Sequence, residues 1–285
     1  MMDVGRHPRI QLFTNSEIEN VTGFVGNFHV TLRKRAKYVD ESACNACGDC
    51  ATACPVAVPD GYQQGFSSRK AIYMPFPQAV PSSYLIDMEA CLGNNPIACG
   101  KCKEVCEKRC IDYDAKDEFV DFEVGAVVVA TGAEVYDPTE YDEYGYRRHD
   151  NVITSMEFER LICAGGPTEG HFMRPSDRKR PKRIGFIQCV GSRSLSEKGN
   201  PYCSNICCMN TVKSTLLLAD HYPDVESTVF YMDLRAFGKG FEDLYRRSKE
   251  SGARYLRGLP GEVMEDPDTG NLWLTVENTV SNKLE

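Results

Sequence analysis

Two stretches of the chain carry clear patterns of apolar and polar residues. Over residues 28–33 the two kinds alternate, and this period of two predicts a half-buried β-strand after a turn at 26–27. Residues 123–132 instead form a nearly continuous run of apolar, largely β-branched side chains that ends at a glycine. We expect this run to be a strand buried in a parallel sheet.

The C-terminal part alternates between strand-like and helix-like segments. The predicted strands are 183–189, 227–232, one near Tyr255 and 272–276, and the predicted helices are 204–220 and 241–251. This order favours an α/β fold with a parallel sheet. Residues 137–183 are polar and broken by Gly165-Gly166-Pro167, so we interpret them as a surface excursion.

Residues 40–114 form a cysteine-dense block of a different kind. They hold nine of the fourteen cysteines, and the stretch 55–90 within them is rich in proline and glycine, which predicts loops. The run Cys44–Pro55 has the spacing C-x2-C-x2-C-x3-C-P, which bacterial-type ferredoxins use to hold [4Fe–4S] clusters. In that arrangement the fourth cysteine of each run ligates the other cluster. The spacing predicts one cluster on Cys44, Cys47, Cys50 and Cys106 and another on Cys54, Cys91, Cys99 and Cys102.

The second run departs from the ferredoxin spacing. Seven residues rather than two separate Cys91 from Cys99, and this insertion would have to loop out to leave the ligand set intact. The spacing therefore leaves open whether Cys91 or Cys110 ligates the second cluster. Zinc is an alternative, since both runs contain C-x2-C pairs. Two complete four-cysteine runs exceed what zinc needs, so we favour iron–sulfur clusters.

A third group of cysteines lies outside this block and consists of Cys189, Cys203, Cys207 and Cys208. At the start of the predicted helix, Cys203 and Cys207 would fall on one face, and Cys189 ends a predicted strand. Four such thiols are able to hold a further [4Fe–4S] cluster, although buried free cysteines are an equal alternative on spacing alone. Cys163 has no partner motif, and we interpret it as structural.

Composition narrows the class of protein. With 285 residues the chain is long enough for about two domains. The formal net charge of -8 argues against nucleic acid as the main partner. We find no stretch typical of a signal peptide and no apolar run long enough for a membrane span. We therefore expect a protein of a reducing, anaerobic cytoplasm.

Half of a flavin site is suggested by Ala130, Thr131 and Gly132, which close the valine-rich run. Such a turn lets the backbone approach a dinucleotide cofactor. The phosphate-binding half is missing, because the sequence has no G-x-G-x-x-G and Gly238-Lys-Gly240 lacks the third glycine.

Several longer strings make the chain resemble the middle of the A subunit of heterodisulfide reductase, a flavin-containing, electron-bifurcating family. The strings are Asp3–Pro8, Cys44–Pro55, Arg69–Gln78, Val124–Gly132, Ile187–Arg193, Asn200–Met209 and Tyr231–Gly240. The resemblance implies a thioredoxin-reductase-like flavoprotein domain interrupted by a two-cluster ferredoxin domain. It also implies a third cluster on Cys189, Cys203, Cys207 and Cys208, and places Lys213 near the flavin.

On this basis we expect a β segment of the flavoprotein domain at 1–39, the ferredoxin-like domain at 40–114, and an incomplete α/β flavoprotein-like domain at 115–285. Family members begin with the glycine-bearing half that this chain lacks and continue beyond its end. We therefore expect a fragment or the product of a split gene, inactive alone. FAD is expected to bind only together with the missing N-terminal half or a partner.

The resemblance implies a function in single-electron transfer between a flavin and ferredoxin-type or disulfide-reducing partners. It implies a hetero-oligomeric complex with subunits similar to heterodisulfide reductase B and C, hydrogenase or formate dehydrogenase modules, and ferredoxin. One alternative is a flavin-free subunit of a redox complex that only relays electrons between clusters and has no catalysis of its own. The other is a structural zinc protein.

Overall fold

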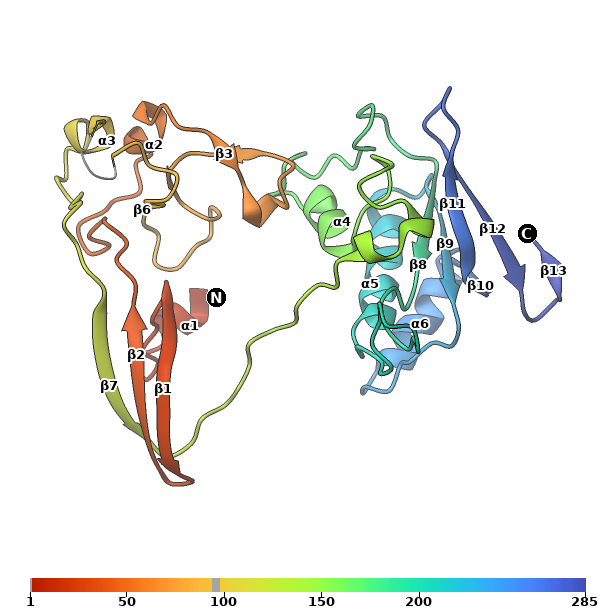
Figure 1. The fold of residues 1–285 in the computed structure, drawn as a ribbon, viewed down its shortest axis with the longest axis horizontal. Coiled ribbons are helices and arrows are strands. Elements are labelled where there is room, and N and C mark those ends of the chain that lie inside the picture. Colours follow the sequence, from red (N-terminus) through yellow and green to blue (C-terminus); the bar gives the residue numbers. More distant parts are fainter. Residues whose placement is uncertain (1, 94–97) are drawn as a thin grey trace. The chain divides into compact units, whose positions relative to one another are not determined.

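Figure 1 shows the computed structural model, which describes residues 2–93 and 98–285. The chain divides into two compact units, Met1–Gly132 and Ala133–Glu285. Both mix short helices with small sheets, so the chain is of mixed α/β class. Within the described residues, no helix is both long and apolar enough to cross a membrane.

The first unit begins with α1 (Met2–Arg6) and contains an antiparallel sheet in the order β1–β2–β7. β1 (Ser16–Phe24) and β2 (Asn27–Lys34) form a hairpin, which confirms the strand predicted at 28–33. β7 (Glu118–Val124) pairs with the other edge of β2, although the whole cysteine-dense block lies between them in sequence (Figure 1). Polar side chains bridge the strands on one face, where Thr31 Oγ1 donates to Asp121 at 2.7 Å.

The cysteine-dense block forms a lobe with little regular structure. Its helices are α2 (Asp49–Ala53), η1 (Gly61–Gln63) and α3 (Lys101–Glu104), and its strand pairs are β3 (Val58–Pro59) with β4 (Ser68–Arg69) and β5 (Ile72–Tyr73) with β6 (Leu85–Ile86). This confirms the loops predicted for 55–90. Ile72, Ile86 and Ile111 are buried in its core together with several of the cysteines. Few apolar side chains hold this lobe together apart from those that surround the thiols.

The prediction of a buried strand at 123–132 is wrong. β7 ends at Val124, and the following residues form no strand. Val128 and Val129 are 87% and 80% exposed. A β-branched run has the propensity for a strand, but it is buried only where other strands pair with it and helices cover it. No described residue of this chain supplies that cover.

The second unit contains a parallel sheet in the order β10–β9–β8, as the predicted α/β pattern requires. The strands are β8 (Arg183–Ile187), β9 (Glu226–Tyr231) and β10 (Arg254–Arg257), and the connecting helices are α5 (Cys207–His221) and α6 (Phe241–Glu250). Val212 on α5 and Val229 on β9 are fully buried. A chain of hydroxyls joins the buried Thr215 and Ser248 to the half-buried Tyr255 at 2.6 and 2.8 Å, and it links α5 to α6 and β10.

An antiparallel sheet completes this unit and consists of β11 (Pro260–Glu265), β12 (Leu272–Asn278) and β13 (Lys283–Leu284). β12 confirms the strand predicted at 272–276. β11 was not predicted, because its first two residues, Pro260 and Gly261, are typical of turns.

The interpretation of 137–183 as a surface excursion is wrong in part. After the short turns η2 (Pro138–Glu140) and η3 (Asp142–Tyr144), the chain forms α4 (Ser155–Ile162). Thr154 caps this helix in a capping box with Glu157. Phe158 is 3% exposed and packs edge-on against Phe172 and Phe186. The capping pattern T-x-x-E was present in the sequence as a signal for this helix.

Candidate iron–sulfur sites

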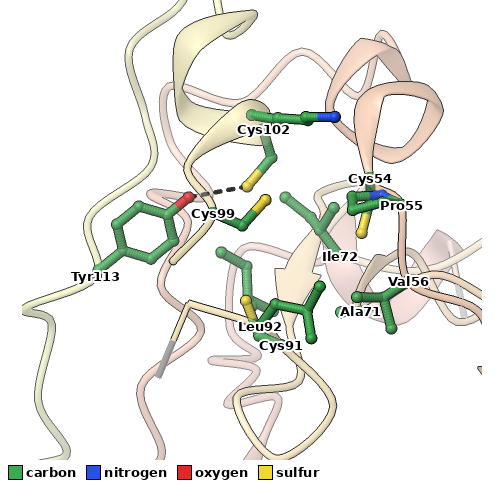
Figure 2. A pocket seen from close by; sticks show the side chains of 12 residues that line it. Cys54, Pro55, Val56, Ala71, Ile72, Cys91, Leu92, Cys99, Cys102 and Tyr113 are labelled. Carbon is green, nitrogen blue, oxygen red and sulfur yellow. Dashed lines mark hydrogen bonds between the residues drawn. The ribbon is translucent and has the colours of Figure 1, made fainter. Parts of the chain in front are cut away.

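The lobe contains two neighbouring cavities, and each is lined by one of the predicted ligand sets. Cys44, Cys47, Cys50 and Cys106 line the first, together with Cys110 and Tyr84. The four cysteines Cys54, Cys91, Cys99 and Cys102 line the second, together with apolar side chains and Tyr113 (Figure 2). Four thiols around one cavity are the donor set that a [4Fe–4S] cluster requires. The residues present therefore fit two clusters.

The two ligand sets are crossed between the sequence runs. Cys54 belongs to the first run but lines the second cavity, and Cys106 does the reverse. Cys54 ends α2 in an extended conformation, with φ -71° and ψ 121°. Proline disfavours the helical region for the residue before it, so Pro55 turns Cys54 out of the helix that carries Cys50.

An apolar wall separates the two cavities. Ile72 lines both of them and is 1% exposed. α2 begins after Gly48, whose φ of +93° is in the left-handed region that favours glycine. A Cβ at this position would lie 3.3 Å from Tyr84 Oη in the first cavity. The backbone at Gly48 and the hydroxyl of Tyr84 therefore approach each other closely on the side of the first cavity.

Cys91 and Cys110 lie in different places. Cys91 lines the second cavity, whereas Cys110 is buried beside the first, with its Sγ 3.5 Å from Cys106 Sγ. Leu92, at the start of the insertion, also lines the second cavity. The rest of the predicted loop includes residues 94–97, which lie outside the described residues.

Burial dominates the acid–base behaviour of these thiols. It raises the pKa of Cys50 to about 11, with the thiols of Cys44 and Cys47 adding to the effect. Burial also raises the pKa of Cys102, against a hydrogen bond from Tyr113. Burial, followed by the contact with Cys106, raises the pKa of Cys110 to about 12. Metal ligands must be thiolates, so cluster binding at neutral pH displaces protons from these buried thiols.

The third group of cysteines lies in the second unit. Cys189 follows β8, whereas Cys207 and Cys208 open α5. Hydrogen bonds from Cys189 and Cys208 lower the pKa of Cys207, while the same contacts and burial raise the pKa of Cys189 and Cys208. Cys203 is close enough to Cys208 to act on its charge. The structure thus brings Cys189, Cys207 and Cys208 into contact, with Cys203 nearby in the segment before α5.

The backbone explains how these thiols meet. Gln188, at the end of β8, donates from Nε2 to Thr211 Oγ1 on α5 at 2.7 Å, and both residues are buried. This bond fixes Cys189 beside the first turn of α5. The predicted helical relation between Cys203 and Cys207 is wrong, because α5 begins only at Cys207. Within the described residues, no three Cys, His, Asp or Glu side chains are placed to share one metal ion.

The predicted flavin residues lie in different units. Ala130, Thr131 and Gly132 are in the exposed segment after β7. Lys213 lies on α5 and forms an ion pair with Glu159 of α4, which also accepts a hydrogen bond from Asn210. Burial opposes these contacts, but together they lower the pKa of Glu159. No sequence signal pointed to Glu159 or to Tyr113, since their roles depend on contacts across the fold.

Comparison with known proteins adds to this geometry. Residues 37–60 match the family model described as "4Fe-4S binding domain". The chain is 48% identical over its full length to the A subunit of the H2:CoB-CoM heterodisulfide,ferredoxin reductase of Methanothermobacter marburgensis, and covers 42% of that protein. It is 53% identical over 98% of its length to an iron-sulfur A subunit of the CoB–CoM heterodisulfide reductase of Methanopyrus kandleri, again covering 42%.

A third relative is the A subunit of the ferredoxin:CoB-CoM heterodisulfide reductase of Methanosarcina acetivorans, which is 42% identical over the whole chain. The chain covers 38% of that protein. It therefore spans about two fifths of the length of these relatives.

Proposed function

The chain belongs to the family of the heterodisulfide reductase A subunits, and from this premise we propose that it is an iron–sulfur electron-transfer segment of such an oxidoreductase. It passes single electrons between a flavin and ferredoxin-type or disulfide-reducing partners. The observation that carries the proposal is the crossed arrangement of eight cysteines around two adjacent cavities. A bound [4Fe–4S] cluster would accept or release one electron at a time, and no covalent bond of the protein would have to break.

The protein's own residues prepare these cavities for electron transfer. The thiols hold the clusters, and Pro55 directs Cys54 across to the second one. Buried aliphatic side chains, with Ile72 between the cavities, exclude water, and exclusion of water is one of the factors that set cluster potentials.

We assign the third cluster to Cys189, Cys203, Cys207 and Cys208. The contacts of Cys189 after a parallel strand with Cys207 and Cys208 at the start of α5, and the nearby Cys203, support this assignment. Arg193 lies close enough to hydrogen-bond Cys189 and forms an ion pair with Asp233. A cation beside a cluster thiolate offsets part of its negative charge.

The flavoprotein part of the proposal rests on topology and on the relatives. β7 closes a sheet with β2 across the cysteine-dense block, as expected for a domain into which that block is inserted. The parallel sheet of the second unit is compatible with a thioredoxin-reductase-like domain. FAD would need a glycine-rich phosphate-binding segment in addition to Ala130, Thr131 and Gly132. Lys213 would then supply a cation for a reduced, anionic flavin.

The partners follow from the names of the relatives. Those names include ferredoxin, H2 and formate as reactants. For this chain we propose ferredoxin as one electron-exchanging partner, within a complex that also holds a disulfide-reducing protein and a hydrogenase or formate dehydrogenase module.

Transfer from ferredoxin tests the proposal directly. The full chain, purified without oxygen and carrying iron and sulfide, is mixed with chemically reduced ferredoxin, and the loss of visible cluster absorbance is followed. We expect stepwise one-electron reduction, with a smaller capacity in Cys50→Ser. Iron- and sulfide-loaded protein that takes up no electrons from ferredoxin would contradict the proposal. Addition of FAD to the same chain, followed by gel filtration, tests flavin retention separately.

A further inference from the structure

The second cavity contains a hydroxyl group directed at one of its sulfurs. Tyr113 lies on the cavity wall, and its Oη is 3.0 Å from Cys102 Sγ (Figure 2). Lys103 Nζ lies 5.5 Å from the centre of the Tyr113 ring, within the range of a cation–π contact. Cys102 itself is 8% exposed, so water does not compete for this contact.

The direction of this hydrogen bond follows from the chemistry of a cluster ligand. A cysteine bound to iron is a thiolate and has no proton to give. A phenol hydroxyl keeps its proton at neutral pH. Tyr113 is therefore the donor and Cys102 Sγ the acceptor. Hydrogen bonds to an ionised acceptor are about twice as strong as neutral ones.

In the described parts of the chain, no tyrosine hydroxyl contacts a sulfur of the first cavity. The partners of Cys50 and Cys106 are backbone N–H groups and the thiol of Cys110. An S–H group is a much weaker donor than a phenol. Tyr84 lines this cavity too, and within the described residues its hydroxyl has no hydrogen bond to a sulfur. The two cavities are thus lined by the same kind of ligand set but differ in their hydrogen-bond donors.

We propose that the hydroxyl of Tyr113 raises the reduction potential of the cluster held by Cys102. This inference rests on the proposed function. One-electron reduction adds a negative charge that spreads onto the ligand sulfurs, and a donor on Cys102 stabilises the reduced form more than the oxidised form. Tyr113 does not ligate iron itself and acts on the cluster only through its hydrogen bond to Cys102 Sγ.

The test is an EPR-monitored redox titration of the full, cluster-loaded chain. We expect Tyr113→Phe to lower the potential of one cluster, with about a tenfold change in its ratio of reduced to oxidised form, or about 59 mV for one electron. The other clusters of the chain should keep their potentials. Tyr84→Phe, the matched control beside the first cavity, should leave the Tyr113-dependent potential unchanged. Unchanged potentials in Tyr113→Phe, or an equal drop in Tyr84→Phe, would overturn the proposal.

A second variant tests the proposal even if Tyr113→Phe does not fold. Replacement of Tyr113 by 3-fluorotyrosine keeps the ring and makes the hydroxyl a stronger donor, so it should raise the same potential. A fall or no change would contradict the proposal. A chain without iron and sulfide would overturn the proposed function instead, whereas a chain with both clusters and no response at Tyr113 would overturn only this inference.

Discussion

Cys110 Sγ lies 3.5 Å from Cys106 Sγ, although only Cys106 belongs to the predicted ligand set. Both thiols line the first cavity, and Cys110 is 8% exposed. The cavity therefore contains five thiols for a cluster that needs four. A thiol so close to a ligand is placed to take over its position.

This predicts unequal effects of single and double substitutions. Cys110→Ala should keep the full iron content, and Cys106→Ala should keep most of it because Cys110 replaces the lost ligand. The double variant should lose about four irons per chain, the content of one cluster. Iron and acid-labile sulfide analysis of the three proteins measures this. Loss of a full cluster in Cys106→Ala alone would show that Cys110 is no substitute.

Crossed ligation predicts which substitutions behave alike. Cys54→Ser should change the EPR signal of the same cluster as Cys102→Ser, because both residues line the second cavity. Cys50→Ser, in the same sequence run as Cys54, should change the other signal. The contrary result, in which Cys54→Ser and Cys50→Ser alter one and the same signal, would mean that the runs are not crossed.

The wall between the cavities should matter for stability. Ile72 is 1% exposed, and its truncation to alanine should lower the free energy of unfolding of this lobe by about 2–5 kcal/mol. Ile72→Val, which removes one methylene group, should cost about 0.5–1.5 kcal/mol. Denaturant titrations of the cluster-loaded variants, followed by visible absorbance, provide the comparison. Equal midpoints for Ile72→Ala and wild type would argue against a packed wall.

Much of the cluster lobe was predictable from sequence, because ligand spacing is a local property. The positions of Cys44, Cys47 and Cys50 around one cavity follow from short chain segments, and Pro55 explains the departure of Cys54 from its helix. The contact between Tyr113 and Cys102 was not predictable, since it depends on how α3 packs against the segment that leads to β7.

The failures in the fold have equally specific causes. The valine-rich run at 125–132 has strand propensity, but its burial depends on neighbouring strands that the described part of the chain does not provide. We did not predict α4, because the sequence around it is polar and this favoured a surface loop over the helix start that the capping pattern at Thr154 indicates. Propensity predicts local conformation, whereas exposure is decided by the whole fold.

The ion pair of Lys213 and Glu159 should contribute little to stability. The two side chains are 50% and 32% exposed, and pairs of this kind are worth about 1 kcal/mol or less. Lys213→Ala should therefore change the free energy of unfolding by less than about 1 kcal/mol, measured by urea titration. A loss of several kcal/mol would assign Lys213 a structural role instead of the proposed role beside the flavin.

The proposed function requires that this chain carry electrons on iron–sulfur clusters. The most direct test is the joint measurement of iron, acid-labile sulfide and zinc in the full chain purified without oxygen. We predict about twelve irons with matching sulfide, from two clusters in the lobe and one on the cysteines of the second unit. About eight irons would contradict the assignment of the third cluster. Zinc without sulfide would contradict the electron-transfer function itself.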